Sequence, residues 1–309
     1  MILSCGESLI DMLPRETATG EAAFAPYAGG AVFNTAIALG RLGAKAGFLS
    51  GISTDLMGEV QEAALAGSNV DSSLAIRSDR PTTLAFVKLT NGHASYAFYD
   101  ENTAGRMLEP ADLPAVLSDV KALFFGGISL PVDPCGGTYE ALMLREAARG
   151  KLTMIDPNIR PGFIKDEPAY RARLERMIAV ADIVKLSDED LVWLMGEGEI
   201  EPLARALLAK GPSLVCITEG AKGAHGFSAA HSVFAPARKV EVVDTVGAGD
   251  TFNAGVLAAL EDAGALTKEA VANADAALIE AALTLGVRAA AVTVSRAGAN
   301  PPTRAELVA

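Results

Sequence analysis

The chain of 309 residues has only three cysteines and three histidines, the residues on which disulfide frameworks and transition-metal sites depend. Cys5, Cys135 and Cys216 are far apart, odd in number and flanked by apolar or small residues. We therefore expect reduced, buried thiols, which are typical of a cytoplasmic protein. The histidines show neither metal-ligand spacing nor a nucleophile pattern with cysteine or serine, so surface positions are expected for them.

Positive charge is also scarce, because 26 Lys and Arg residues stand against 38 Asp and Glu residues, for a formal net charge of −12. An acidic surface repels phosphate backbones and anionic lipid, so neither nucleic acid nor a membrane is expected as a partner. No uninterrupted apolar run reaches the roughly 20 residues that span a bilayer. Residues 1–7 lack the basic region of a signal peptide and instead predict a buried first strand.

Two familiar nucleotide-binding strings are missing. The chain contains no Gly-x-x-x-x-Gly-Lys-Ser/Thr loop, and Phe252 stands where the third glycine of Gly-x-Gly-x-x-Gly would be. A nucleotide is not thereby excluded, since local N–H groups and a metal ion can override the global charge.

A glycine-rich turn is present, reading Asp-Thr-Val-Gly-Ala-Gly-Asp over residues 244–250, and it runs into an apolar helical segment. Free N–H groups at a helix start attract anions, and Gly247 and Gly249 would let a phosphate approach the main chain. Asp250 then places a carboxylate beside that anion site, as a base for phosphoryl transfer to a hydroxyl requires. The same aspartate is also a common first-turn residue of ordinary helices, so the turn alone leaves both interpretations open.

Strand and helix patterns alternate along most of the chain, which predicts an α/β fold with a mostly parallel sheet covered by helices on both faces. Strands are expected at 2–6, 9–13, 22–27, 46–50, 121–126, 152–156, 182–186, 213–218 and 290–295. Helices are expected at 31–42, 56–66, 134–149, 168–180, 187–195, 200–210, 249–263 and 267–285. A hairpin over 83–99, with an Asn91-Gly92 turn, predicts an antiparallel addition to the main sheet, and a second hairpin is expected across 222–235.

Two segments in order, about 200 residues apart, resemble the signatures of the PfkB (ribokinase-like) carbohydrate kinases. The first is Ala-Gly-Gly-Ala-Val-Phe-Asn-Thr-Ala-Ile-Ala-Leu-Gly-Arg-Leu-Gly at 28–43, and the second is the turn at 244–250. Similarity extends to Asp11, to 156–161, to 218–223 and to 295–302. The resemblance implies one ribokinase-like kinase domain over 1–309, with a small antiparallel β lid formed by about 12–27 and 82–100.

The resemblance also implies roles for individual residues. Asp250 would be the catalytic base, and the backbone of Gly247, Ala248 and Gly249 would form the anion hole for the transferring phosphoryl group. The positions implied to hold the sugar are Asp11, Gly29, Gly30 and Asn34, with Phe98 in the lid and Arg160 meeting substrate or phosphate. Those implied to bind the nucleotide are Thr218, Gly220, Gly223 and Ser187.

The expected cofactors are ATP and Mg²⁺, with K⁺ as a further possibility. Many relatives carry Asn-x-x-Glu where this chain has Ser187 and Asp190, so water-mediated Mg²⁺ support by Asp190 is an expectation that the altered motif weakens. Ser187 fits equally well as a helix N-cap. A monovalent cation beside Asp244 is implied by the resemblance alone.

The implied reaction is transfer of the γ-phosphoryl group of ATP to a primary hydroxyl of a small sugar. The strings at 6–14, 156–161 and 185–190 are most similar to bacterial fructokinases, which predicts fructose as substrate. The alternatives are 2-keto-3-deoxygluconate kinase, ribokinase, and a catalytically silent sugar or nucleotide sensor on the same fold. We expect Asp250 to be ionised because of the helix dipole. A homodimer through the exposed lid edge is also expected.

Overall fold

A computed structural model describes residues 1–90, 93–115 and 117–308. Its main sheet has nine strands in the order β15-β14-β13-β12-β11-β10-β1-β4-β6. These strands are β1 Ile2–Cys5, β4 Ala46–Leu49, β6 Val70–Asp71, β10 Ala122–Gly126, β11 Leu152–Asp156, β12 Ile183–Ser187, β13 Leu214–Thr218, β14 Gly223–Phe227 and β15 Ser232–Pro236. All neighbours pair in parallel except β13–β14 and β14–β15, which are antiparallel. The predicted mostly parallel sheet is confirmed.

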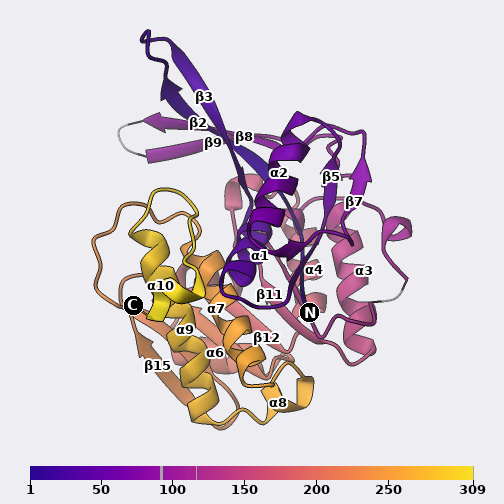
Figure 1. Ribbon diagram of the computed structural model, residues 1–309. Coiled ribbons are helices and arrows are strands. Elements are labelled where there is room, and N and C mark those ends of the chain that lie inside the picture. The colour runs from indigo at the N-terminus through magenta and orange to yellow at the C-terminus, as the bar shows by residue number, and fades with distance from the viewer. Residues whose placement is uncertain (91–92, 116, 309) are drawn as a thin grey trace.

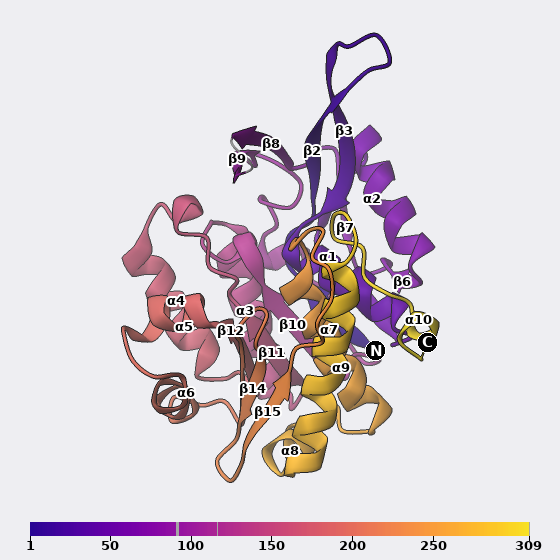
Figure 2. The same ribbon diagram turned by 90° about the vertical axis from the view of Figure 1, so that its left-hand side faces the viewer.

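Helices cover both faces of this sheet, as Figure 2 shows for α4, α5 and α6 on one side and α7 and α9 on the other. The helices are α1 Ala31–Arg41, α2 Leu56–Gly67, α3 Cys135–Ala148, α4 Glu167–Ile178, α5 Asp188–Met195, α6 Ile200–Leu208, α7 Ala248–Asp262, α8 Lys268–Ala272, α9 Ala276–Val294 and α10 Arg304–Val308. Three short 3₁₀ turns are η1 Pro110–Asp112, η2 Gly127–Ser129 and η3 Pro161–Phe163.

The hydrophobic core lies in two layers, one on each face of the sheet. Successive residues of a strand point to opposite faces, so Ile2 packs with α1, α7 and α9 while Leu3 packs with α3 and α4. Because both faces are covered, the central strands are fully buried apolar runs such as Ala-Leu-Phe-Phe-Gly in β10. Lys185, a charged residue inside β12, is an exception to this apolar pattern.

A second, four-stranded sheet stands away from the layered body (Figure 1). Its order is β3-β2-β8-β9, with β2 Leu9–Glu16, β3 Ala22–Gly29, β8 Leu84–Thr90 and β9 His93–Tyr99. The hairpin expected over 83–99 is present as antiparallel β8 and β9, and β8 joins β2 in parallel. The expected Asn91-Gly92 turn lies outside the described residues. A small two-stranded sheet of β5 Gly51–Ser53 and β7 Ile76–Ser78, together with β6, was not predicted.

The C-terminal region corrects two expectations. The helix expected at 267–285 is divided into α8 and α9, because the Asp275 carboxylate accepts a hydrogen bond from Leu278 N at 2.8 Å and caps a new helix start. The strand expected at 290–295 is instead the end of α9. Its Val-Thr-Val sequence has high strand propensity, but packing against α7 overrides that preference, and Thr293 donates a hydrogen bond to Ala289 O one helical turn earlier.

Among the helices that the structure describes, α9 alone is long and apolar enough to cross a membrane, despite Glu280 and Arg288. It packs along α7 and against β14 and β15, which makes it a core helix of the layered fold. The α7–α9 contact brings two backbones together, because a Cβ built on Gly255 would lie 2.5 Å from the Cα of Gly286. Glycine at these positions therefore sets the separation of the two helices.

Replacing Gly255 by alanine should lower the free energy of unfolding by about 1–3 kcal/mol, because the added methyl group overpacks the α7–α9 contact. Urea unfolding checks this. Gly67 is the matched control, since it also lies in a helix but is exposed with open space around its Cα. Gly67→Ala should raise stability by roughly 0.5–1 kcal/mol through helix propensity. Equal effects of the two substitutions would contradict the close packing of α7 on α9.

Candidate active site

The predicted glycine-rich turn forms the start of α7, and its N–H groups are open. Gly247 is the N-cap residue with φ 77°, and a Cβ there would lie 2.7 Å from the Cβ of Ala299, so both conformation and space require glycine. The N–H groups of Gly247, Gly249 and Asp250 donate to no other described residue, while Ala248 N donates to Thr245 O over a long 3.4 Å. Open donors at a helix start suit a bound anion.

Asp250 lies in the first turn of the same helix and is in contact with a second predicted site residue. Its carboxylate Oδ2 accepts a hydrogen bond from Asn34 Nδ2 at 2.9 Å, and its carbonyl oxygen accepts one from Thr35 Oγ1 at 3.2 Å. Asn34 and Thr35 belong to α1, so α1 and α7, far apart in sequence, are joined at this carboxylate. Asp250 is only 7 % exposed.

The protonation state of Asp250 differs from the expectation. Burial raises the pKa of its carboxyl to about 7, with Asp156 and Glu7 adding to the rise and Asn34 and Lys185 opposing it. The expectation of a fully ionised aspartate is therefore wrong. The helix dipole does favour the carboxylate, but the loss of water around a buried charge costs more.

The first helix brings a second group of predicted residues together. Gly29 ends β3, and a Cβ added there would overlap the carboxylate Oδ2 of Asp11 in β2. Gly30 caps α1 with φ 108° and packs against the backbone of Glu7. Burial raises the pKa of Asp11 to about 6. Asp11, Gly29 and Gly30 thus lie at the start of α1, whose Asn34 reaches Asp250.

Sequence reasoning missed Glu7, which is 8 % exposed at the same helix start. Its carboxylate accepts hydrogen bonds from Ala31 N at 3.0 Å and Ser129 N at 3.4 Å, and burial raises its pKa to about 7. The signal for it was a charged residue directly after a buried strand, at the carboxyl edge where ligands of parallel sheets bind.

Sequence reasoning also missed a buried ion pair formed by Lys185 in β12 and Asp156 at the end of β11. Lys185 Nζ lies 3.0 Å from Asp156 Oδ2, and Asn253 of α7 donates to the same oxygen at 2.7 Å. The signal for it was a lysine inside the apolar run Ile-Val-Lys-Leu-Ser, since a lysine is almost never buried without a partner.

The residues expected to bind the nucleotide gather at the ends of two neighbouring strands. Ser187 and Thr218 are register partners at the carboxyl ends of β12 and β13. Gly220 and Gly223 follow with φ 51° and 138°, and a side chain at Gly223 would strike the backbone of Ala235. Ser187 is the N-cap of α5, because its Oγ accepts from Asp190 N at 3.0 Å, which is the alternative considered for it.

Asp190 is buried, and its Oδ1 accepts a hydrogen bond from Ile159 N at 3.2 Å. Burial and the nearby Asp156 raise its pKa. Within the described part of the chain, no group of three or more His, Cys, Asp or Glu residues could hold a metal ion. Mg²⁺ often needs only one or two carboxylates, with phosphate and water oxygens completing its shell. The hard oxygen donors of Asp190 and Ser187 fit that manner of binding.

Arg160 directly precedes η3, and Phe98 contacts a residue of η3. Arg160 is exposed, and its Nη1 donates to Ile159 O at 3.0 Å. The ring of Phe98 in β9 meets that of Phe163 edge to face, with centroids 5.2 Å apart. The small sheet therefore touches the loop that carries Arg160.

The side chain of Asp244 links the turn before α7 to the loop after α9. Its Oδ1 accepts from Val246 N at 3.0 Å and its Oδ2 accepts from Gly298 N at 2.9 Å. Each carboxylate oxygen is thus already engaged by one backbone donor, so the carboxylate ties the turn before α7 to the loop after α9.

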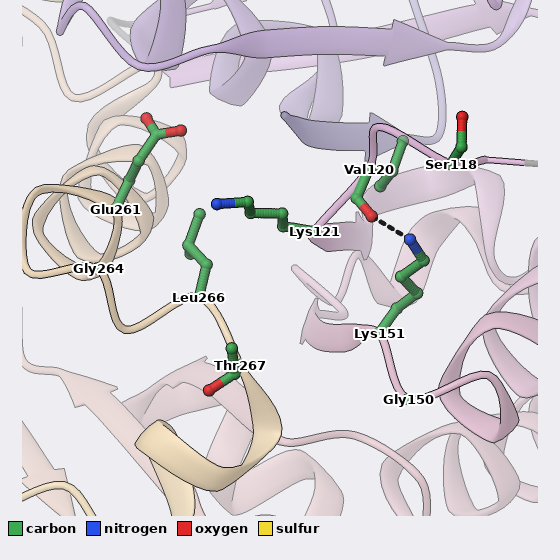
Figure 3. Close-up of a pocket in the computed structure, with 9 residues that line it drawn as sticks. All are labelled: Ser118, Val120, Lys121, Gly150, Lys151, Glu261, Gly264, Leu266 and Thr267. Carbon is green, nitrogen blue, oxygen red and sulfur yellow. Dashed lines mark hydrogen bonds between the residues drawn. The ribbon is translucent and has the colours of Figure 1, made fainter.

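Two hollows in the structure lie at opposite edges of the main sheet. One is lined by Glu7, Asp100, Arg106 and Phe163 among others, at the carboxyl edge beside the small sheet. The other, in Figure 3, lies at the amino edge between Lys121, Lys151 and Glu261. There the Lys151 ammonium donates to the carbonyl of Val120. Ligands of parallel sheets bind at carboxyl ends, so the first edge is the candidate site.

Comparison of the sequence with known protein families shows to which family the chain belongs. The model of the pfkB family carbohydrate kinases matches residues 1–306. The chain belongs to this family. It is therefore a carbohydrate kinase, a phosphotransferase with the ribokinase-like fold.

Several similar proteins are fructokinases. A fructokinase of Rhizobium leguminosarum bv. trifolii is 58 % identical over 275 residues, covering 89 % of this chain and 84 % of the relative. The crystal structure of a fructokinase with bound ATP from Xylella fastidiosa has a TM-score of 0.91 at 28 % identity, covering 99 % of this chain and 96 % of that one. A double mutant of the fructokinase of Vibrio cholerae O395, with fructose, ADP and potassium ion bound, has a TM-score of 0.87 at 25 % identity, with coverage of 99 % and 96 %.

Asp250→Asn should make the carbohydrate kinase more stable above neutral pH. The wild-type carboxyl has a raised pKa in the folded state, so ionising it costs folding free energy that increases as pH rises from about 4 and levels off above about 7. Asparagine avoids this cost and can still accept from Asn34. Urea unfolding at pH 5 and pH 8 should show a gain on the order of 1–4 kcal/mol at pH 8 and a smaller one at pH 5. A gain independent of pH would contradict the raised pKa.

Proposed function

We propose that this carbohydrate kinase transfers the γ-phosphoryl group of ATP to the primary hydroxyl of fructose, giving fructose 6-phosphate. The observation that carries the proposal is the carboxylate of Asp250, held by Asn34 behind the open N–H groups that start α7. The name of the Rhizobium relative, at 58 % identity, supports fructose as the acceptor.

Asp250 is proposed as the base that takes the proton of the attacking hydroxyl. A pKa of about 7 suits this task, because a base works best when its pKa lies near the working pH. The backbone N–H groups of Gly247, Ala248 and Gly249 are proposed to receive the transferring phosphoryl group. Donors fixed in place before the reaction stabilise the developing negative charge without reorganising.

The sugar is proposed to bind at the start of α1. Asp11 and Asn34 offer polar atoms to its hydroxyls, and the absence of side chains at Gly29 and Gly30 leaves the room that the Asp11 carboxylate and the backbone of Glu7 occupy. The small sheet, through about 12–27 and 82–100 with Phe98 among its residues, is proposed to act as a lid on one kinase domain spanning 1–309. Covering the sugar excludes water and limits wasteful hydrolysis of ATP.

ATP is proposed to lie along the carboxyl ends of β12 and β13, near Ser187, Thr218, Gly220 and Gly223. The Xylella relative was crystallised with ATP, which supports a nucleotide site in this fold. Bound Mg²⁺ would be supported through water by Asp190 and would neutralise phosphate charge. The monovalent cation expected beside Asp244 stays a prediction, to which the potassium ion of the Vibrio structure lends support. Free, buried thiols at all three cysteines support a cytoplasmic location.

Side-by-side kcat/KM values for fructose, ribose and 2-keto-3-deoxygluconate with MgATP test the substrate. We expect fructose to be preferred by at least tenfold. The acid sugar is the competing substrate, because the exposed guanidinium of Arg160 could pair with its carboxylate. A preference for 2-keto-3-deoxygluconate that disappears in Arg160→Ala would overturn the fructose assignment while keeping the kinase assignment.

Asp250→Asn is the variant that separates a kinase from a sensor on the same fold. Loss of a general base costs about 10²–10⁴ in rate, so kcat for the best sugar should fall by that factor while nucleotide binding persists. Turnover within threefold of wild type would remove Asp250 from the role of base.

A homodimer through the lid is proposed from its exposed edge and aromatic face. Strand β3 is a sheet edge, and Phe24, Phe86 and Tyr99 form a row of edge-to-face rings across the small sheet. Phe24 is 48 % exposed and Tyr99 62 %. An open edge strand with apolar side chains favours pairing with a second copy.

Light scattering on a sizing column should give the mass of a dimer for the wild type and of a monomer for Phe24→Asp. Phe234→Asp is the matched control, because Phe234 of β15 is similarly exposed, at 46 %, but lies outside the lid. A monomeric wild type, or equal loss of the dimer in both variants, would contradict pairing through the lid.

A further inference from the structure

Lys185 is a charged residue in the middle of a buried strand. It is 4 % exposed, and Asp156, its partner at 3.0 Å, is 2 % exposed. The carboxylate of Asp156 is fully engaged, since Oδ2 also accepts from Asn253 Nδ2 at 2.7 Å and Oδ1 accepts from Asn158 N at 3.1 Å. These contacts fix the ammonium in one place.

The fixed ammonium lies against the start of α7. A Cβ built on Gly249 would be 3.0 Å from Lys185 Nζ. The positive charge therefore lies next to Gly249, which carries one of the open N–H groups and directly precedes Asp250. Asn253, one helical turn after Gly249, completes the link between the ion pair and α7. The ion pair is therefore in contact with the turn that the proposed reaction uses.

Stability alone does not account for this pair. Removing two charges from water costs several kcal/mol each, and well-packed apolar residues of similar volume are often at least as stabilising as a buried ion pair. Strand β10, two places away in the same sheet, has no polar side chain. A costly ion pair confined to the proposed active site indicates a role in the reaction.

The charges around Asp250 indicate what that role is. Asp156 of β11 and Glu7 after β1 face it with negative charge, Lys185 of β12 with positive charge, and Asn34 of α1 with a neutral amide. From α9, which packs along α7, the neutral Thr293 meets Thr251. Among the largest influences on the Asp250 carboxyl, Lys185 supplies the positive charge. Burial lowers the pKa of Lys185, but Asp156, Asp190 and Asp250 together raise it above its usual value, so it stays charged at neutral pH.

We propose that Lys185 is a positioning residue of the active site: held by Asp156 and Asn253 against Gly249, its ammonium supplies positive charge behind the phosphoryl-binding turn and keeps Asp250 able to accept a proton. This inference rests on the proposed role of Asp250. It also gives a reason for Gly249, because a Cβ there would lie only 3.0 Å from the ammonium and press on it. The reaction still proceeds by attack of the sugar oxygen on the γ-phosphorus as the bond to ADP breaks, with the hydroxyl proton passing to Asp250.

The test is the pH dependence of kcat/KM in Lys185→Met, Asp156→Asn and the double variant, measured with whichever sugar the wild type prefers. Removing the cation should move the acid-side pKa upward in Lys185→Met, and removing the anion should move it downward in Asp156→Asn. The double variant should restore the wild-type pKa approximately while kcat stays at least tenfold low, since the positive charge behind the turn is gone. Thermal melting confirms that each variant is folded.

The double variant keeps the test decisive if Lys185→Met, which leaves Asp156 buried without its counter-charge, fails to fold. Lys268→Met is the matched control. Lys268 pairs with Asp182 at 2.8 Å at the other end of β12, far from Asp250, so its loss should leave the pH profile unchanged. Parallel losses of rate with no movement of the profile, or a double variant with wild-type kcat, would overturn the inference.

Failure of the proposed function gives a different result. If Asp250→Asn retains wild-type turnover, the base assignment is wrong whatever Lys185 does. If Asp250→Asn is inactive and the Lys185 and Asp156 variants leave the profile in place, the base assignment stands and the inference about Lys185 alone is wrong.

Discussion

The burial of one carboxylate at the start of α7 is the constraint on which the rest of this active site depends. Two effects act on Asp250 in opposite directions. The helix dipole and the hydrogen bond from Asn34 favour the charged form, and exclusion of water favours the protonated form. The pKa of about 7 shows that exclusion of water is the stronger effect. The same burial that makes the carboxylate costly to ionise makes it a stronger base than an exposed aspartate.

The fold provides this environment by bringing together elements that are distant in sequence. α1 contributes Asn34, and the parallel order β11–β12 places Asp156 and Lys185 at the edge where α7 begins. The small sheet rises from the same edge, because β2 follows directly after the turn that carries Glu7. Each contributing strand or helix is anchored in the apolar core, so the polar groups that meet at this edge are positioned by packing that does not itself involve them.

Features that depend on local sequence could be predicted, and features that depend on burial could not. The turn at 247–249 and the hairpin β8–β9 follow from glycine and alternation signals within a few residues. The raised pKa of Asp250 arises mainly from burial, with Asp156 of β11 and Glu7 after β1 adding to it, and no local pattern reports either effect. The end of α9 was mistaken for a strand for the same reason, since its Val-Thr-Val run is helical only because α7 packs beside it. The sequence does contain a sign of the buried Lys185, namely a charge inside an apolar strand. Its partner Asp156 could not be identified in the same way, because the order of strands in the sheet determines it.

Two of the requirements of this site, an open N–H group and room for the Lys185 ammonium, act on the single residue Gly249. Its N–H donates to no other described residue and is open to an anion, and a Cβ built on it would lie 3.0 Å from the ammonium of Lys185. A Cβ at this position would press on the ammonium and shift it by a few tenths of an ångström relative to its partner Asp156. The glycine is therefore needed here for the space it leaves to a charged group, while Gly247, with φ 77°, is needed for its backbone conformation as well. Two glycines in one turn thus satisfy different physical demands, and a short sequence motif by itself does not distinguish them.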